Sequence, residues 1–365
     1  MLVSGTLENL ILKFGEPGSP YPKDRKEFGE SFYRSWKPIL IQEGFYRFLF
    51  GHESYLEFQK KLSSLSEDPI GVSLALSCMV EVNVAGGILS HATQVYSKNI
   101  GQNLIQNDSL NREPNGADIF NSLWDGFRTE NPTKIFAVGV SEPGWESKLR
   151  KLSSTVIEGK LSGTKSFITN GAEADLIFWV TKSEEENPVY LVRRSQDLRK
   201  PNLESVTSNI SKQTKEESFH TDFTPLVSHL KLTLCEYPID PEDLILDNYG
   251  KLGMELRLKE LLSLVSLLIG KTKKLSLENQ LVNEKRKNLC LWRENFLGDC
   301  QGNPNADFLL SGFPFPTEGL LLALCKHWNL ESPKDLKSVD PDYQLFVWED
   351  QFTQMLIQKK KRKLS

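Results

Sequence analysis

Two short segments carry the residue types of this chain that suit ligand chemistry. Residues 141–144 read Ser-Glu-Pro-Gly and end a β-rich run, and residues 167–171 read Phe-Ile-Thr-Asn-Gly and end another. Two strand ends of this kind present backbone N–H and C=O groups, hydroxyls and an aromatic ring. Such a scaffold can hold the polar edge of a flat heteroaromatic ring while the aromatic side chain covers its face. The pattern therefore predicts a site for a planar ring.

The two segments resemble, in order and at nearly the same separation, two motifs of the acyl-CoA dehydrogenase family. The Thr-Glu-Pro-Gly-x-Gly-Ser-Asp loop of that family corresponds here to residues 141–148, Ser-Glu-Pro-Gly-Trp-Glu-Ser-Lys. Its Trp-Ile-Thr-Asn-Gly strand end corresponds to residues 167–171. A hairpin joins the two, which makes the pair more specific than either motif alone. The alternative is an ordinary β domain with chance Glu-Pro-Gly and Asn-Gly turns.

The resemblance implies a flavoprotein oxidoreductase of fatty acid metabolism that acts on the CH–CH bond of an acyl-CoA. FAD is the implied cofactor, and an electron-transfer flavoprotein is the implied partner. The family is dimeric or tetrameric, so a homo-oligomer is expected. The implied cofactor-binding residues are Val138, Val140, Ser141, Gly144, Ser147, Phe167, Ile168, Thr169 and Arg286, and Ser147 is also the implied substrate-binding residue.

Dehydrogenation of a thioester needs a base next to the carbonyl, and in the family this base is a glutamate near the C-terminus. The family has Tyr-Glu-Gly-Thr there, followed by an Ile-Gln-Arg-Leu-Ile helix. Residues 347–350 of this chain read Val-Trp-Glu-Asp, and residues 353–357 read Thr-Gln-Met-Leu-Ile. Glu349 is therefore the expected catalytic base. The alternative is a glutamate on the exposed face of an amphipathic helix.

Arg286 lies in Glu-Lys-Arg-Lys, which resembles the Glu-Arg-Lys end of a C-terminal-domain helix in the family. The arginine of the family contacts the flavin dinucleotide's pyrophosphate, often across a subunit boundary. A guanidinium suits that role because its planar fork donates to two phosphates. The alternative is a solvated arginine at a helix end, stabilised by the helix dipole.

Some residues depart from the family pattern. Glu146 and Lys148 replace a glycine and an aspartate, Phe167 replaces a tryptophan, and Leu261 stands where an arginine is expected. The stretch between residues 287 and 349 lacks a helix pair with a Gln-x-x-Gly-Gly-x-Gly segment. These departures motivate a second hypothesis, in which a degenerate, inactive member is a binding or interaction protein. A third possibility is an oxidase that passes electrons to oxygen.

Hydrophobic periodicity predicts an α+β architecture in three parts. Residues 1–133 and 248–365 have helical periodicity, and residues 134–247 have β periodicity. The resemblance implies that these parts are an N-terminal helical domain, a shortened C-terminal helical bundle and, between them, a β-barrel-like middle domain with the flavin site. Expected helices include residues 28–50, 54–65, 72–95, 117–127, 253–287, 318–328 and 343–363. Expected strands include residues 176–181, 189–192 and 230–234, whereas the polar residues 196–222 are expected to form a long loop or poorly ordered hairpin.

Composition and charge argue against a nucleic-acid-binding protein, a metal site and a membrane span. The 365 residues are 39% hydrophobic and 25% charged, with a formal net charge of −4, so no global attraction to nucleic acid is expected. The basic end, residues 359–363, is interpreted as a solvated helix terminus rather than a nucleic-acid patch. None of the five cysteines forms a CxxC pair, so we expect no metal site and a reducing, cytoplasmic location. Glu81 and Asn83 interrupt the apolar residues 72–89, which favours a buried helix over a membrane span.

Overall fold

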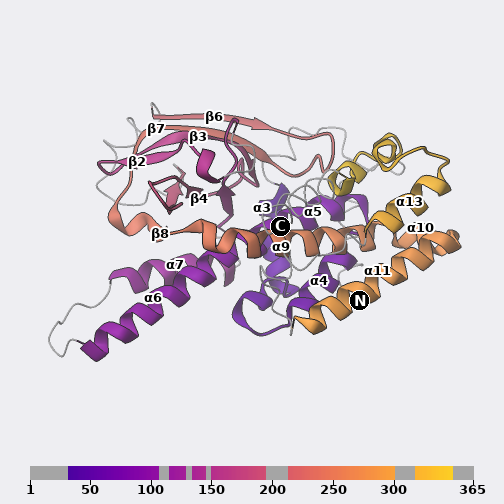
Figure 1. Ribbon diagram of the computed structural model, residues 1–365, viewed down its shortest axis with the longest axis horizontal. Coiled ribbons are helices and arrows are strands. Elements are labelled where there is room, and N and C mark those ends of the chain that lie inside the picture. Colours follow the sequence, from indigo (N-terminus) through magenta and orange to yellow (C-terminus); the bar gives the residue numbers. More distant parts are fainter. Residues whose placement is uncertain are drawn as a thin grey trace, which may run out of the picture.

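The computed structural model describes residues 32–106, 115–128, 134–144, 149–194, 213–300 and 317–347. Helices come first, two four-stranded sheets follow, and helices end the described chain. Figure 1 shows the sheets stacked above the long helix α9 (Tyr249–Lys271), with the other helices beneath and beside it. The predicted α+β architecture is confirmed.

The N-terminal part is helical and contains one long apolar stretch, Ile70–Lys98. Its elements are α3 (Phe32–Gln42), the 3₁₀ turn η1 (Arg47–Phe50), α4 (Tyr55–Leu65), α5 (Pro69–Val80), the π-helical segment η2 (Glu81–Ala85), α6 (Gly86–Gln106) and α7 (Asn115–Arg128). The start of α4 is the predicted cap, because the Ser54 side chain accepts a hydrogen bond of 3.2 Å from the Glu57 N–H. The expected helix over residues 28–50 is shorter in the structure, since a turn follows Gln42.

The middle part contains two sheets. One has the strand order β1 (Phe136–Gly139), β4 (Leu176–Val180), β5 (Val189–Arg193) and β8 (Leu244–Leu246), with β1 parallel to β4 and the other pairs antiparallel. The other is antiparallel, with the order β2 (Thr155–Ile157), β3 (Lys160–Thr169), β7 (His229–Pro238) and β6 (Thr214–Phe219). The 3₁₀ turns η3 (Leu149–Lys151) and η4 (Pro241–Asp243) lie in the connections.

Strand β6 corrects the expectation of a loop or poorly ordered hairpin over residues 196–222. Residues 214–219 pair with β7 in a regular antiparallel register, whereas residues 195–212 lie outside the described chain. Four of the six β6 side chains are exposed, because β6 is at the edge of its sheet. An edge strand with solvent on its faces needs no apolar alternation, so its sequence resembles a loop.

The C-terminal part also differs from one expectation. The single helical pattern expected over residues 253–287 is divided into α9, α10 (Lys273–Glu278) and α11 (Gln280–Asp299). Asn279 starts α11, since its side chain accepts a hydrogen bond of 3.0 Å from the Val282 N–H. Helix α13 (Thr317–His327), the turn η5 (Pro333–Ser338) and a short helical stretch over residues 343–347 complete the described chain.

Gly270 brings α9 against α4. A Cβ at this position would lie 1.9 Å from the carbonyl oxygen of Ser63 and 2.2 Å from Oγ of Ser66. No side chain fits at that separation, so the glycine permits direct contact between the two helix backbones. The helical layer under the sheets is therefore packed to backbone contact at this point.

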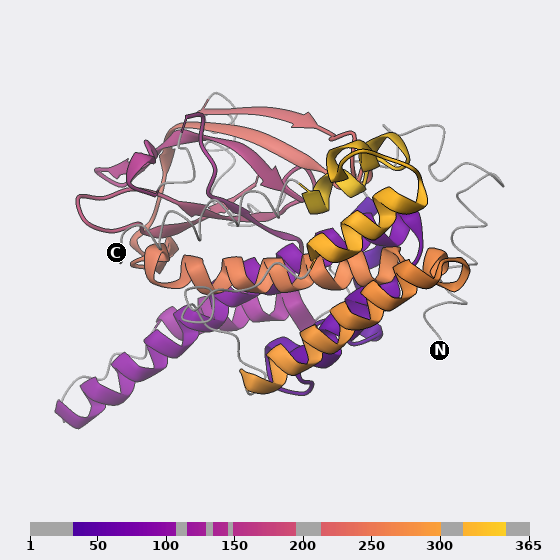
Figure 2. The ribbon, with the colours of Figure 1, turned by 45° about the vertical axis from the view of Figure 1, so that its right-hand side comes forward.

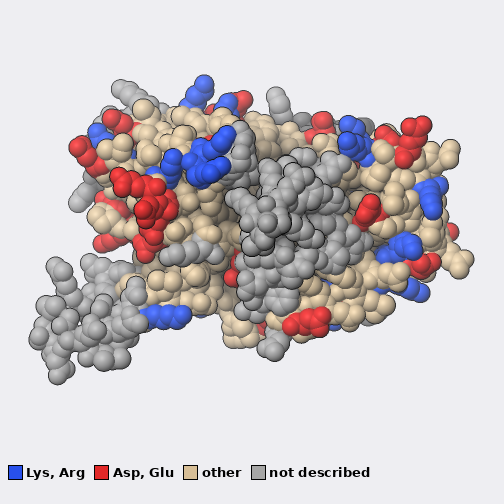
Figure 3. All heavy atoms as spheres, viewed as in Figure 1, with Lys and Arg blue, Asp and Glu red and all other residues tan. Residues whose placement is uncertain are grey.

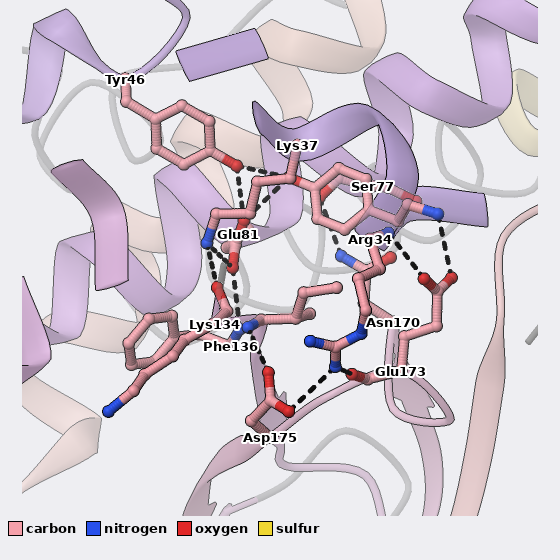
Figure 4. A network of polar contacts seen from close by, with 12 residues as sticks. Arg34, Lys37, Tyr46, Ser77, Glu81, Lys134, Phe136, Asn170, Glu173 and Asp175 are labelled. Carbon is pink, nitrogen blue, oxygen red and sulfur yellow. Dashed lines mark hydrogen bonds and ion pairs between the residues drawn. The ribbon is translucent and has the colours of Figure 1, made fainter. Parts of the chain in front are cut away.

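A buried carboxylate joins the helices to the first strand. Glu81, in the π-helical segment, accepts hydrogen bonds from Tyr33 (2.8 Å), Tyr46 (2.5 Å), the ammonium of Lys37 (2.8 Å) and the backbone N–H of Phe136 (2.8 Å) (Figure 4). The side chains of Lys37 and Glu81 are fully buried. Burial lowers the pKa of Lys37, although Glu81 opposes the shift. The start of β1 is thus fixed to α3, η1 and the π-helical segment.

The apolar helix of the N-terminal part has the length and composition of a membrane span. The continuous stretch Ile70–Lys98 passes that test, yet 89% of its most apolar window is buried inside the protein. Core helices of this kind are common. On the face drawn in Figure 3, acidic and basic residues are interspersed among uncharged ones, consistent with the small net charge.

Candidate functional site

The two predicted strand ends lie together although they belong to different sheets. The carbonyl oxygen of Ser141, just after β1, accepts hydrogen bonds from the backbone N–H of Ser166 (2.8 Å) and from its hydroxyl (3.2 Å). Ser166 lies in β3, directly before Phe167. These bonds hold the two sheets edge to edge where both segments end.

The glutamate of the Ser-Glu-Pro-Gly segment points inward rather than toward a ligand. The carboxylate of Glu142 accepts hydrogen bonds from the N–H (2.5 Å) and hydroxyl (2.7 Å) of Ser153, from the N–H of Ser154 (3.1 Å) and from Lys165 (2.6 Å). Burial would raise the pKa of Glu142, but hydrogen bonding and attraction to Lys165 outweigh it and lower the pKa to about 2. Glu142 therefore shapes the loop as a buried anion.

Lys165 is the partner that links the two segments. Its ammonium is fully buried and also donates to the carbonyl oxygens of Val140 (3.2 Å) and Val180 (2.6 Å). Burial lowers the pKa of Lys165 to about 8, although Glu142 opposes the shift. The lysine thereby fixes the end of β1 against the end of β4. Sequence reasoning missed this residue, although it lies only two positions before Phe167.

The end of β3 presents an aromatic surface. Phe167 is 39% exposed, and its ring centroid lies 4.3 Å from that of His229 and 5.5 Å from that of Phe219. Thr169 is the register partner of His229 across the β3–β7 pair, so the two side chains share one face of the sheet. Ile168 points to the opposite face and is fully buried in the core. Only the backbone of Ile168 is left for a ligand.

His229 was not predicted from the sequence. It is 1% exposed, and neither ring nitrogen has a hydrogen-bond partner. Burial and the nearby His220 lower the pKa of His229 to about 3, so the imidazole is neutral at physiological pH. A buried polar group without a partner costs about 1–3 kcal/mol, and such groups are uncommon in native proteins. His229 packs against Phe167 and is paired in register with Thr169, so an unpartnered imidazole lies directly behind the exposed aromatic surface.

The hydroxyls of Ser141 and Thr169 are also free to bind. Both residues are half-buried, and neither hydroxyl takes part in a hydrogen bond within the described residues. Val138 and Val140 are half-buried along the same strand end. Gly144 adopts a φ of 72°, and a Cβ there would meet nothing within 4 Å, so its glycine serves the turn rather than a close approach within the chain.

The remaining predicted residues are separate from this arrangement. Ser147 and Glu349 lie outside the described residues, as do Glu146 and Lys148. Arg286 is on α11, and its Nε donates to the carbonyl oxygen of Ile269 in α9 (2.8 Å). Figures 1 and 2 both show α9 between the sheets and α11. Within one chain, α9 therefore separates the helix that carries Arg286 from the sheets.

No protein-family model and no curated protein sequence matches the chain. Among solved structures, the glutaryl-coenzyme A dehydrogenase–glutaryl-CoA complex is similar with a TM-score of 0.64 and 12% identity, covering 100% of this chain and 95% of that one. A structure of PigA with FAD and proline has a TM-score of 0.60 and 14% identity, covering 94% and 98% of the two chains. The apo form of PigA has a TM-score of 0.58 and 14% identity.

These similarities extend over nearly the whole of both chains. At 12–14% identity they establish the fold, which is that of the acyl-CoA dehydrogenases. The resemblance first indicated by residues 141–148 and 167–171 is thus confirmed at the level of architecture. The chain is a divergent example of this fold, because few of its residues are identical to those of the similar structures.

Proposed function

We propose that this chain binds FAD, with the flavin ring against the ends of β1 and β3, and is a flavin-dependent dehydrogenase. The observation that carries the proposal is the partly exposed Phe167 ring near the junction of the two sheets, with the unpaired hydroxyls of Ser141 and Thr169 and the buried, unpartnered imidazole of His229 close by. The fold supports it, since the similar structures include PigA with FAD and proline.

The residues of this chain fit such a ring. Phe167 supplies a partly exposed aromatic surface, and the free hydroxyls of Ser141 and Thr169 supply polar contacts. Val138, Val140 and the backbone of Ile168 complete the walls. Gly144 keeps the loop in its turn, and Ser147 is the proposed contact for both cofactor and substrate.

The proposed substrate is an acyl-CoA. Bound FAD supplies a hydride acceptor for the carbon two positions from the thioester carbonyl. Glu349 is the proposed base that removes the proton from the carbon next to that carbonyl. The chain would orient the thioester between the base and the cofactor. Exclusion of water from the site at the ends of β1 and β3 would favour proton removal.

The electron acceptor, the oligomeric state and the cellular location are proposed from the family resemblance. Electrons pass to an electron-transfer flavoprotein, the chain forms a homodimer or homotetramer, and the protein is cytoplasmic and works in fatty acid metabolism. Arg286 binds the pyrophosphate of FAD in a neighbouring subunit. The intramolecular bond from its Nε to Ile269 leaves the terminal nitrogens of the guanidinium for that role.

A binding or interaction protein without turnover is the second candidate function. The substitution of Glu146 and Lys148 for a glycine and an aspartate favours it, since a glycine would let backbone approach the ligand. In this reading the buried Glu142–Lys165 pair preserves the fold of the site after the chemistry has been lost. The two candidates differ in whether the protein binds flavin and turns over acyl-CoA.

The first experiment is a visible absorption spectrum and an FAD titration of purified protein. We expect FAD binding that weakens by about fivefold in each of Ser141→Ala and Thr169→Ala, the loss of roughly one hydrogen bond. Thr233→Ala is the matched control, since its hydroxyl is already paired with Thr164 at 3.0 Å in the same sheet. Absence of FAD binding by folded protein would contradict the proposal.

Turnover is tested separately with a panel of acyl-CoA substrates and an artificial electron acceptor. We expect dehydrogenation by the wild-type protein and a loss of at least 100-fold in kcat for Glu349→Gln, the usual scale for a general base. FAD binding without turnover would favour the binding protein. Peroxide formation without an acceptor would identify an oxidase.

A further inference from the structure

A cavity in the N-terminal helical part is separate from the ends of β1 and β3. It has a volume of about 540 Å³ and lies between the turn η1 and the last turns of α7. Small-molecule sites have volumes of roughly 300–1,000 Å³. The size is therefore that of a binding site for a small organic molecule.

The floor of this cavity is aromatic, and its polar atoms are already used. Trp124 donates its indole N–H to Thr93 at 3.0 Å, and the Tyr46 hydroxyl donates to Glu81 at 2.5 Å. Phe127 is fully buried next to both, with ring centroids 5.8 Å and 6.2 Å away. The floor thus offers ring carbon rather than hydrogen-bonding groups, which suits a flat apolar body.

The rim of the cavity is cationic. Arg47, His52 and Arg128 line it, and none of the acidic residues that the structure describes does. Within the described part of the chain neither guanidinium lies within ion-pair distance of a carboxylate, and the nearby Glu53 is engaged by Lys61 at 2.8 Å.

The Arg128 guanidinium instead stacks over the Phe50 ring, 4.5 Å from its centroid. Phe50 also meets Trp124 edge-on at 5.4 Å. A guanidinium that lies over a ring face still has N–H donors for an anion. Arg47 and Arg128 can therefore pair an anion while the aromatic floor contacts a ring.

We propose that this cavity binds a planar aromatic anion, with the ring against Trp124 and the anionic group between Arg47 and Arg128. The ligand class covers aryl sulfonates and aryl carboxylates, which carry their acidic group directly on a flat ring. The site is independent of the flavin site, since none of its lining residues belongs to β1 or β3.

The proposal is tested with naphthalene-2-sulfonate as the probe, by isothermal titration calorimetry on the full chain. We expect one saturable site in the wild-type protein. The double variant Arg47→Gln and Arg128→Gln should bind about tenfold more weakly, the loss of roughly one charge-assisted hydrogen bond. Both arginines are exposed, so the variant should retain its thermal unfolding midpoint.

Two controls make the result specific. Lys326→Gln removes an exposed cation from α13 and should leave binding unchanged. Saturating FAD should not compete with the probe, which separates this cavity from the flavin site. Equal affinity of the double variant and the wild type, competition by FAD, or binding of neutral 2-naphthalenemethanol as tight as that of the sulfonate would each overturn the proposal.

Discussion

Two buried polar residues, Glu81 and His229, differ in their hydrogen bonding. Glu81 is fully buried and accepts four hydrogen bonds, from two tyrosines, a lysine and a backbone N–H. His229 is 1% exposed and has no partner at either ring nitrogen. A saturated carboxylate stabilises the junction that it bridges, whereas an unpaired imidazole costs stability. The saturated helix–sheet junction therefore favours stability, whereas the unpaired imidazole agrees with the binding role proposed for the β3–β7 face.

The largest expected effect comes from removing the saturated carboxylate. Glu81→Leu leaves the Lys37 ammonium, two hydroxyls and the Phe136 N–H without their acceptor, which should cost about 4 kcal/mol of unfolding free energy. Urea unfolding measures the loss. The double variant Lys37→Met and Glu81→Leu is the matched control and should recover part of it, because no uncompensated charge remains. A loss below 1 kcal/mol for the single variant would show that Glu81 does not stabilise the junction.

The Glu142–Lys165 pair should behave like Glu81, with a smaller effect. Glu142→Gln removes the charge opposite a fully buried ammonium and should cost about 3 kcal/mol. Because the pKa of Glu142 is lowered from 4.5 to about 2, its contribution is present above pH 4.5 and is lost as the pH falls toward 2. Denaturant unfolding at pH 3 and pH 6 tests this. A wild-type minus variant difference that does not shrink at pH 3 would contradict the assignment.

Glu173 is intermediate between Glu81 and His229, because it has hydrogen-bond donors but burial still shifts its pKa. Its carboxylate accepts the backbone N–H groups of Tyr33 (3.1 Å) and Arg34 (2.7 Å) at the start of α3. Burial nevertheless raises the pKa of Glu173 from 4.5 to about 7, so the folded protein binds a proton that the unfolded chain has released. Stability from this group is fully present below pH 4.5 and is lost as the pH rises to about 7, by about 3 kcal/mol.

The variant Glu173→Gln removes that titration. We expect a flatter profile of unfolding free energy between pH 5 and pH 8 than in the wild type, whereas the exposed Glu242→Gln should leave the profile unchanged. Parallel profiles for wild type and Glu173→Gln would show that the carboxyl is ionised across this range.

The smallest expected effect is at His229, and it has the opposite sign. His229→Phe keeps an aromatic ring beside Phe167 and removes two unpartnered nitrogens, so the unfolding free energy should rise by about 1 kcal/mol. If the imidazole serves bound cofactor, FAD affinity should fall by about fivefold in the same variant. Opposite changes in stability and affinity would separate a binding role from a packing role. A lower unfolding free energy for His229→Phe than for the wild type would show that the unpaired imidazole does not cost stability.

The sequence predicted the fold through motifs that are local in the chain. Residues 141–148 and 167–171 were enough to indicate the architecture, and Ser54 with Glu57 located the start of a helix. Strand β6 could not be predicted, because an exposed edge strand needs no apolar pattern. The break at Asn279 was missed because leucines continue on both sides of it, and only the cap marks the boundary.

The candidate site was predictable only in part. The strand ends were found, since their residues are contiguous, but Lys165 is recognised only when its distance to Glu142 is known. His229 is 60 positions after Thr169 and becomes its neighbour through strand pairing. Long-range partners of this kind depend on register, which a single sequence specifies weakly.

The π-helical segment Glu81–Ala85 sets a rotational phase between two halves of one helix. A π turn carries about one residue more than an α turn, and each residue rotates an α-helix by about 100°. If the segment took up α geometry with all its residues kept, α6 would turn by about that angle against α5. Thr93 would then leave the indole of Trp124, and the aromatic floor between η1 and α7 would lose its support. The wide π turn thus keeps the rotation of α6 at which Thr93 supports Trp124.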